Sequence, residues 1–358
     1  MSGAGGCTHG YPRAGAPRPR PPRRPRRLRA PALAVLLATT LAGCGDMLVP
    51  DPRPSAPVQM FDQVWSDIDQ YYAHFQMSGV DWDAVRTQYR PLAASAPDDR
   101  HLADVLAAML GELRDPHVTL YTPFRTYEDT SCYRPGGYNQ LATARYLSGA
   151  VTDGHMTRGM IGADIGYIRI PSFVGDGWGG EIDGVLAQLG DVRGLVVDVR
   201  ANAGGMDGTA NTIADRFVDR ETIAEYVRYR SGPGHDQFSD YYPITVAPAG
   251  LRFQGPVAVL TDRRDFSSAE QFVLFMRASP RVRVVGDTTA GASGRPLTRE
   301  LANGWAYRFS TWIAYTPDHR PYEGVGLAPD MVARRAAGDS TLVDRALESA
   351  LAYLKSAP

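Results

Sequence analysis

Lysine is almost missing from this sequence of 358 residues, in which Lys355 is the only one. Cysteine is also scarce: none of the three cysteines combines with histidines at the spacing of a zinc site, so no metal is expected. The formal net charge of −1 creates no overall field that would attract nucleic acid or acidic partners. The glycine-rich stretch at 200–205 has neither the G-x-G-x-x-G nor the P-loop spacing. Nucleotide binding is therefore disfavoured, and no cofactor is expected.

The N-terminal region has the pattern of an export signal followed by a tether. A segment dense in arginine and proline precedes a short apolar run at 30–43, which is too short for a permanent membrane span. The run ends in LAGC, which resembles the bacterial lipobox. We therefore expect a signal peptide over 1–43, a lipid on Cys44 and a proline-rich tether over 44–57. The mature protein would then be anchored to the bacterial cell envelope, facing the periplasm or the outside. An ordinary cleaved signal is the alternative.

Processing of this kind also limits the chemistry of the mature chain. Cys7 is removed with the signal and Cys44 carries the lipid, so Cys132 has no partner for an intrachain disulfide. The basic cluster is removed as well, which leaves nucleic-acid binding poorly supported.

A helical domain is predicted over 58–123, because apolar residues recur there at steps of three and four. It ends at the sequence RDPH, where Pro116 stops the last helix and a strand is expected at 118–121. His117 lies on this break, where side chains are often functional. The competing interpretation is a structural histidine, and the other histidines, His74 among them, have no comparable setting.

The rest of the chain alternates between buried strands and amphipathic helices. Residues 124–160 are rich in glycine, tyrosine and threonine and are expected to form an irregular connector. An α/β domain is predicted over 161–340, with buried strands at 194–199 and 257–260. A closing helix is expected within 341–358.

Ser267 lies where the apolar strand at 257–260 gives way, after a polar turn, to a helical pattern. Ser267 and Glu270 form the S-x-x-E capping box, and capping alone would explain both residues. The other interpretation is acyl transfer, because free N–H groups and the positive end of a helix dipole stabilise an oxyanion beside such a serine. The stretch alone favours capping, so the choice depends on the rest of the chain.

Six motifs, taken together and in order, resemble the S41 serine peptidases, the family of carboxyl-terminal processing proteases and the tricorn core. They are RDPH at 114–117, GYIRI at 166–170, DVRANAGG at 198–205, SSAEQF at 267–272, GDTTAG at 286–291 and EGVGLAPD at 323–330. The resemblance implies a crotonase-like (ClpP-like) α/β superhelical core behind an N-terminal helical cap. It also implies a serine endopeptidase that hydrolyses peptide bonds in peptides or unfolded proteins.

The same resemblance assigns roles to individual residues. The nucleophile falls on Ser267. One branch of the family uses a lysine base, but Ala292 stands at that position and Lys355 lies far away, so a Ser–Lys dyad is disfavoured. The other branch places the base on His117 and a carboxylate on Glu323, which would orient the imidazole directly or through a bridging residue.

The oxyanion would be held by backbone N–H groups of Gly204 or Gly205 and of Ser268. For Glu323, a solvated loop carboxylate is the competing interpretation. Asp115 and Asp265, each next to a proposed catalytic turn, would then be the next candidates for the third member.

One departure from the processing proteases concerns substrate selection. The 124–160 connector is too short for the PDZ domain that those enzymes often insert, so the cleft itself would have to select substrates. Two other functions remain open: a catalytically inactive, lipid-anchored binder of peptides or apolar ligands, and an esterase on the same fold. No G-x-S-x-G elbow surrounds Ser267, which weighs against the usual esterase fold. Assembly into a homo-oligomer is also left open.

Overall fold

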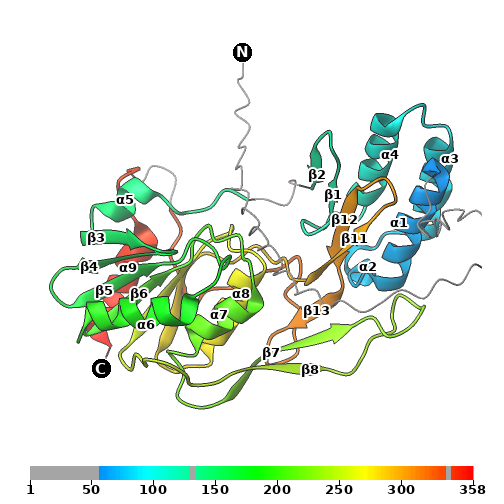
Figure 1. The fold of residues 1–358 in the computed structure, drawn as a ribbon. Helices are drawn as coiled ribbons and strands as arrows, with labels where there is room; N and C mark the ends of the chain where they lie inside the picture. The colour runs from blue at the N-terminus through cyan, green and yellow to red at the C-terminus, as the bar shows by residue number, and fades with distance from the viewer. Residues whose placement is uncertain (1–55, 130–133, 336–339, 358) are drawn as a thin grey trace, which may run out of the picture. The chain divides into compact units, whose positions relative to one another are not determined.

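The computed structural model describes residues 56–129, 134–335 and 340–357 and contains a seven-stranded sheet with the order β14-β10-β9-β6-β5-β4-β3, seen on the left in Figure 1. Strands β5, β6, β9, β10 and β14 run parallel, while β3 and β4 add an antiparallel edge. The strand bounds are β3 Ser148–Asp153, β4 Met156–Ile161, β5 Ile165–Arg169, β6 Gly194–Asp198, β9 Val257–Thr261, β10 Val282–Gly286 and β14 Met331–Val332. The parallel strands β6 and β9 are buried throughout, as expected when helices cover both faces of a sheet.

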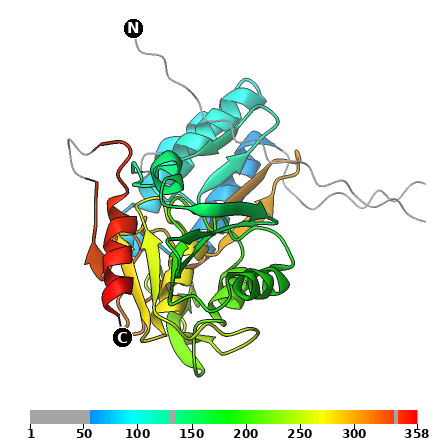
Figure 2. The same ribbon diagram turned by 90° about the vertical axis from the view of Figure 1, so that its left-hand side faces the viewer.

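Helices cover both faces of this sheet. Along β6 and β9, alternate residues point to opposite sides: Val197 and Val259 join one core, and Val196 and Ala258 join another. The first core packs against α6 (Trp178–Leu189), α7 (Asp207–Ala214) and α8 (Ser268–Arg277). The second packs against α9 (Arg345–Ser356), the red helix that stands alone on its side of the strands in Figure 2.

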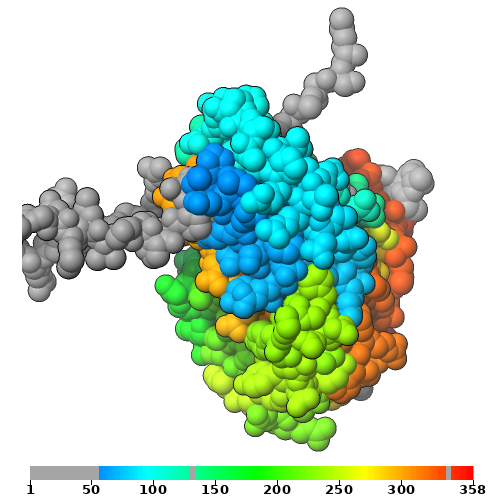
Figure 3. Space-filling model, turned by 90° about the vertical axis from the view of Figure 1, so that its right-hand side faces the viewer, coloured from blue at the N-terminus to red at the C-terminus, as the bar shows by residue number. Residues whose placement is uncertain are grey.

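The N-terminal helices share their core with a hairpin from the other end of the chain. Helices α1 (Pro57–Tyr71), α3 (Trp82–Ala94) and α4 (Asp99–Gly111) bury an apolar core, and α2 (Phe75–Ser78) is a single turn between them. A four-stranded sheet, β11-β12-β1-β2, joins the same core. Its strands are β1 Thr119–Tyr121, β2 Thr126–Glu128, β11 Pro296–Glu300 and β12 Ala306–Ser310. Figure 3 shows the blue and cyan helices with the orange hairpin at their edge.

A third, three-stranded sheet lies below the N-terminal helices in Figure 3, where part of it is yellow-green. Its order is β13-β7-β8, with β7 Thr222–Tyr229 pairing both β8 Tyr242–Val246 and β13 Trp312–Tyr315. The guanidinium of Arg230, just after β7, donates to the carbonyl oxygen of Tyr72, just after α1. This contact ties the third sheet to the N-terminal helices.

The predicted irregular connector at 124–160 is wrong in its content. It contains β2, α5 (Gln140–Ala144), β3 and all of β4 except its last residue. Strand β3 is exposed along its whole length at the sheet edge, so it lacks the buried apolar alternation that reveals a strand in a sequence. Within the described ranges, no helix combines the length and the apolar character needed to cross a bilayer. The predicted lipidation site, Cys44, lies outside the described residues.

Candidate active site

Ser267 lies at the corner between β9 and α8, as predicted, and its backbone is strained. Its φ of 59° and ψ of −125° fall where residues other than glycine are rarely found, at a cost on the order of 1–3 kcal/mol. Its N–H donates to the carbonyl oxygen of Ala292 at 3.0 Å, and its side chain makes no capping hydrogen bond. The residue is half-buried. Its hydroxyl therefore lies at the N-terminus of α8 but does not cap the helix.

The reciprocal capping box of Ser267 and Glu270 does not form, because the Ser267 side chain makes no capping hydrogen bond. The Ser267 N–H interacts with the buried Glu270 carboxylate, but its main acceptor is the Ala292 carbonyl oxygen. The Glu270 carboxylate accepts hydrogen bonds from the Thr289 hydroxyl and from the N–H groups of Gly291 and Ala292, the last two at 2.8 Å. These bonds satisfy the carboxylate and hold the 289–292 loop against Ser267.

The neighbouring Ser268 is occupied elsewhere. Ser268 is fully buried. Its hydroxyl can donate its single proton to Asp207 Oδ1, at 2.7 Å, or to the Gly205 carbonyl oxygen, at 3.0 Å. Of the two adjacent serines, Ser267 is therefore the one with a side chain available to a substrate.

The glycine pair after β6 packs directly on this corner. A Cβ atom on Gly204 would lie 2.9 Å from Ser267 Cβ, so only glycine allows the approach. Gly204 is nevertheless not an oxyanion donor, contrary to one of the predictions, because its N–H donates to Asn202 Oδ1 at 2.7 Å. The N–H groups of Gly205 and Ser268 have no recorded acceptor in the described part of the chain. Ser268 is the first residue of α8, where N–H groups have no partner within the helix.

His117 lies beside the serine corner. Its ring centroid is 4.4 Å from that of Phe266, the residue before Ser267. The side chain is buried, and within the described residues neither ring nitrogen has a hydrogen-bond partner. Burial lowers the pKa of His117 to about 4, against the opposing effect of the nearby Asp115 charge. The imidazole is therefore neutral and able to accept a proton at neutral pH.

Two carboxylates and a second histidine lie behind His117. Asp115 Oδ1 is 3.8 Å from His117 Nδ1 and accepts the His117 backbone N–H at 2.8 Å. Asp115 Oδ2 is 3.3 Å from His74 Nδ1, which also faces Glu323 Oε1 at 3.7 Å. The other oxygen of Glu323 accepts the N–H and hydroxyl of Ser293. We call His74, Asp115, His117 and Glu323 the site cluster.

The structure thus brings Glu323 into the site, with recorded contacts to Ser293 and His74 and none to His117. His74 was missed from the sequence, where it is one of several histidines without a motif. The one feature that could have drawn attention to His74 is its position in the short break between α1 and α2.

His74 carries a positive charge in this arrangement. Its Nε2 lies 2.9 Å from the Trp312 carbonyl oxygen, which can only accept, so Nε2 holds a proton. Nδ1 faces two carboxylates and needs a proton as well. Burial disfavours the charge, but Glu323 and Asp115 outweigh it and raise the pKa of His74 to about 9. The converging atoms of His74, Asp115 and Glu323 lie within 4.8 Å of one another, close enough to share a cation. The proton on Nδ1 meets the same need, so the arrangement requires no metal.

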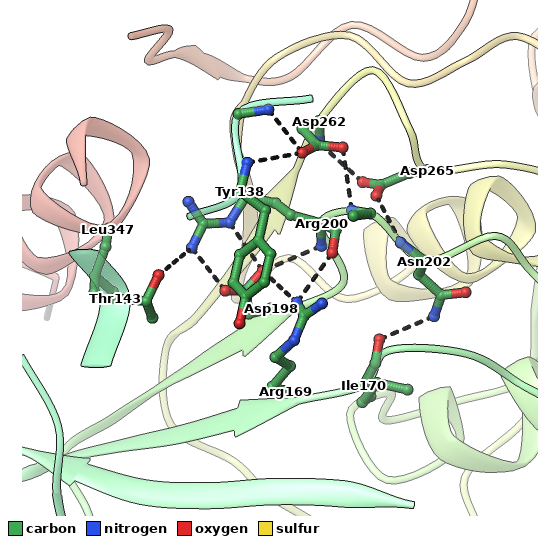
Figure 4. Close-up of polar contacts among 12 residues, drawn as sticks. Tyr138, Thr143, Arg169, Ile170, Asp198, Arg200, Asn202, Asp262, Asp265 and Leu347 are labelled. Carbon is green, nitrogen blue, oxygen red and sulfur yellow. Dashed lines mark hydrogen bonds and ion pairs between the residues drawn. The ribbon is translucent and has the colours of Figure 1, made fainter. Parts of the chain in front are cut away.

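A second buried charged cluster lies at the end of β6, next to the glycine turn. The Arg200 guanidinium donates to both oxygens of Asp198 at the end of β6 and to both oxygens of Asp344 at the start of α9. We call Asp198, Arg200 and Asp344 the clamp. Figure 4 shows Arg200 and Asp198 at its centre, with Asn202 reaching the Ile170 carbonyl oxygen on one side. The clamp therefore fixes the strand end from which the turn at 200–205 begins.

Comparisons with known proteins agree with this geometry. The model of peptidase family S41 matches residues 164–333, and that of the tricorn protease C1 domain matches residues 56–111. Among curated proteins, the chain is similar to a carboxy-terminal-processing protease of Bartonella bacilliformis, with 24% identity over 181 residues. The match covers 48% of this chain but only 39% of that relative, so the chain spans well under half of its length.

Solved structures extend the likeness to most of the chain. A candidate peptidase from Parabacteroides merdae superposes with a TM-score of 0.76 and 31% identity, over 84% of this chain and 97% of that one. The photosystem II D1 C-terminal processing protease shares the fold, with a TM-score of 0.54 at 15% identity, over 82% of this chain and all of the other. The predicted S41-type α/β fold is thereby confirmed, and the chain belongs to peptidase family S41.

Proposed function

We propose that this chain is a serine peptidase in which Ser267 is the nucleophile and His117 its general base. The observation that carries the proposal is the serine corner: a strained, half-buried Ser267 at the start of α8, flanked by a neutral imidazole and by the unused N–H groups of Gly205 and Ser268. A nucleophile, a base and oxyanion donors are the parts that acyl transfer needs.

The reaction would follow the usual order for a serine peptidase. His117 Nδ1 faces Asp115, which leaves Nε2 to take the proton of the Ser267 hydroxyl. The Ser267 oxygen attacks the carbonyl carbon, and the oxyanion receives hydrogen bonds from Gly205 and Ser268. The protonated His117 then delivers its proton to the leaving amine. Water, activated by the same imidazole, hydrolyses the acyl-enzyme.

The carboxylates would stabilise the imidazolium that forms during both steps. Asp115 is the carboxylate nearest the His117 ring, and Glu323 would act at one remove, through Ser293 and the charged His74. This modifies the Ser-His-Glu prediction: Glu323 keeps a supporting role, and Asp115 takes the position beside the imidazole.

A fluorophosphonate probe tests the proposal directly. Ser267 should be labelled in the wild-type chain, and His117→Ala should abolish labelling without unfolding the protein. Ser268→Ala is the matched control, because that hydroxyl is engaged by Asp207, and it should still be labelled. Labelling on Ser268, or unchanged labelling without His117, would refute the assignment, and an unreactive Ser267 would favour an inactive binding protein.

The location and substrates are proposed on sequence grounds. We propose that peptides or unfolded proteins are cleaved at the cell envelope, where a lipid on Cys44 holds the enzyme; the LAGC motif supports this. Mass spectrometry of the membrane fraction should find an acylated N-terminal Cys44. A soluble mature form with an unmodified Cys44 would refute the anchor.

A further inference from the structure

Three side chains of the site cluster direct one potential metal-ligand atom each toward the same small region. His74 Nδ1 lies 3.3 Å from Asp115 Oδ2 and 3.7 Å from Glu323 Oε1, and all three atoms lie within 4.8 Å of one another. Zinc binds imidazole nitrogen and carboxylate oxygen at about 2.0–2.2 Å, which places tetrahedral ligands about 3.3–3.6 Å apart. The two separations from His74 come close to that spacing, and the third shortens if a cation draws the carboxylates together.

The other polar atoms of the same three side chains are held by hydrogen bonds. His74 Nε2 donates to the Trp312 carbonyl oxygen at 2.9 Å, and Asp115 Oδ1 accepts a backbone N–H at 2.8 Å. Glu323 Oε2 accepts the N–H and the hydroxyl of Ser293. Metal ligands in proteins are oriented in this way, and a ligating histidine almost always donates its other N–H to a carbonyl or carboxylate oxygen.

The atoms that face the shared region lack such bonds. His74 Nδ1 and Asp115 Oδ2 are buried, and among the described residues neither has a hydrogen-bond partner, although the two form an ion pair. Buried polar atoms without hydrogen bonds require an explanation, and a ligand bound between them is one. Each side chain is thus fixed at one atom and available at another.

We propose that His74, Asp115 and Glu323 form an inhibitory binding site for a divalent transition-metal cation, for which Zn²⁺ fits best. We call these three residues the metal site. Two carboxylates and a neutral imidazole balance the charge of a divalent cation, which favours binding in a buried place. Zinc often takes three protein ligands of these types and a water molecule, whereas Mg²⁺ and Ca²⁺ prefer oxygen ligands in larger numbers. As the metal binds, the proton on His74 Nδ1 is released to solvent.

A cation in the metal site would slow the proposed peptidase. Asp115 Oδ1 lies 3.8 Å from His117 Nδ1, so Asp115 is common to the metal site and the proposed base. A cation on Oδ2 draws the carboxylate charge away from the imidazolium that forms during the reaction, and its own positive charge opposes that imidazolium. The inhibition rests on the proposed function, whereas the binding of the metal does not.

Glu323 gives a cation access to the metal site. It lines a pocket of about 340 Å³ beside the loop at 288–291. Arg114, Arg134 and Arg263 line the same pocket and repel cations. We therefore expect the inhibition to develop slowly after Zn²⁺ is mixed with the enzyme.

Binding is tested apart from catalysis, in the full chain carrying Ser267→Ala. Isothermal titration calorimetry with Zn²⁺ should detect one equivalent that binds more tightly than any other. Weaker sites are expected as background, because His101, His155 and His235 each have one recorded carboxylate partner among the described residues.

Variants connect the tight equivalent to the metal site. His74→Gln, made in the same background, should remove it. Glu323→Gln keeps the shape of the side chain and should weaken it by about a hundredfold or more, since even the partners of metal ligands contribute ten- to a hundredfold to affinity. The matched control is His155→Gln, which removes a histidine paired with Glu181 and should leave the tight equivalent unchanged. Glu323→Gln decides alone if His74→Gln fails to fold.

Inhibition is measured on the wild-type enzyme. Zn²⁺ should slow peptide hydrolysis and the fluorophosphonate labelling of Ser267, Mg²⁺ and Ca²⁺ should not, and EDTA should restore both rates. In Glu323→Gln, the Zn²⁺ concentration that halves the variant's own rate should rise about a hundredfold. In His155→Gln it should stay at the wild-type value.

The outcomes separate the metal site from the peptidase. A tight equivalent that Glu323→Gln weakens would uphold the metal site even if Ser267 failed to react with the probe. Normal labelling of Ser267 without a tight equivalent would overturn the metal site and leave the proposed peptidase intact. A tight equivalent that survives Glu323→Gln, or one that binds without slowing the enzyme, would also overturn the proposal.

Discussion

The clamp and the site cluster, both buried within the described part of the chain, differ in how their polar atoms are satisfied. In the clamp, each guanidinium nitrogen of Arg200 donates to a carboxylate, with distances of 2.7–2.9 Å. In the site cluster, His74 Nδ1, Asp115 Oδ2 and both nitrogens of His117 are buried without a hydrogen bond among the described residues, although ion-pair contacts of 3.3–3.8 Å connect them.

This difference indicates what each cluster does. A buried charge with complete hydrogen bonds stiffens the structure around it, whereas removal of its partner is strongly destabilising. Buried polar atoms without hydrogen bonds reduce the stability of the fold, so their presence requires another explanation. A site that binds or transfers protons provides one. The contrast supports a stabilising role for the clamp and, under the proposed function, a chemical role for the site cluster.

The largest expected effect is on activity. His117→Ala should lower kcat/KM on the order of 10⁴-fold or more, because the serine loses its base. The free energy of unfolding should change by less than about 2 kcal/mol, since His117 has no hydrogen bonds from its ring to lose. Peptide hydrolysis and urea denaturation of the same preparation measure both. Unfolding of the variant would place His117 among the structural residues.

The converse experiment removes the cation of the clamp. Arg200→Met leaves the buried Asp344 carboxylate with no cation and Asp198 with only the longer Arg169 contact at 3.7 Å, which should reduce the free energy of unfolding by about 3–5 kcal/mol. Urea denaturation gives the value. The control is Arg283→Met, on the exposed side of β10, which should stay within about 0.5 kcal/mol of the wild type. A loss below about 1 kcal/mol for Arg200→Met would remove the distinction between the two clusters.

A smaller effect is expected from the outer carboxylate of the site cluster. Glu323→Gln should lower kcat by about a hundredfold, less than the roughly 10⁴-fold loss for a carboxylate bound directly to the catalytic imidazole. Glu323 contacts Ser293 and His74 rather than the His117 ring, and burial raises its pKa to about 8 against the lowering effect of His74. Asp115→Asn should cost more than Glu323→Gln, because Asp115 faces the His117 ring. Steady-state kinetics of both variants decide this, and the reverse order would return Glu323 to the position beside the base.

The smallest effects concern pH. His117 loses its ability to accept a proton as the pH falls through its pKa of about 4, so the acid limb of kcat/KM should lie near there, below the 6.5 of a free histidine. His74 loses its proton as the pH rises through about 9, which exposes Asp115 and Glu323 to mutual repulsion. A decline of a few fold is expected there.

Stability provides a second measurement on the alkaline side. The folded pKa of His74 is above its unfolded value of about 6.5. Its contribution to stability is therefore complete below about pH 6.5 and is lost as the pH rises through about 9. The variant His74→Gln, compared with the wild type by denaturation across this range, should lack that loss. Identical pH profiles for the two proteins would show that His74 carries no charge in the native state.

The predictions from sequence succeeded where the signal was local. The strand predicted at 257–260 and the corner at Ser267 follow from a short apolar pattern and are present in the structure. The capping box failed because the Ser267 side chain does not cap the helix and Glu270 also binds the N–H groups of Gly291 and Ala292, contacts that nothing near Ser267 in the sequence reveals. Strand β3 was missed for another reason: it is exposed along its whole length and carries no buried apolar alternation.

The contacts within the site cluster could not be predicted from short stretches of the sequence. His74 meets Glu323 across almost 250 positions of the chain, and its charge exists only because two carboxylates converge on it. No pattern within either segment carries that information. Asp115, in contrast, was an alternative candidate from the sequence, because it lies two residues before His117 in the RDPH motif.

The pairing of β1 sets the order in which the protein can become active during its synthesis. Strand β1 follows His117 directly and lies between β2 and β12, with Thr119 opposite Arg308. His117 is therefore synthesised long before β12, the strand that pairs with β1, and Glu323 is synthesised later still. Contacts so distant along the chain form late in folding. The serine and the histidine are therefore both synthesised before β12 and Glu323, the segments that complete the site around them.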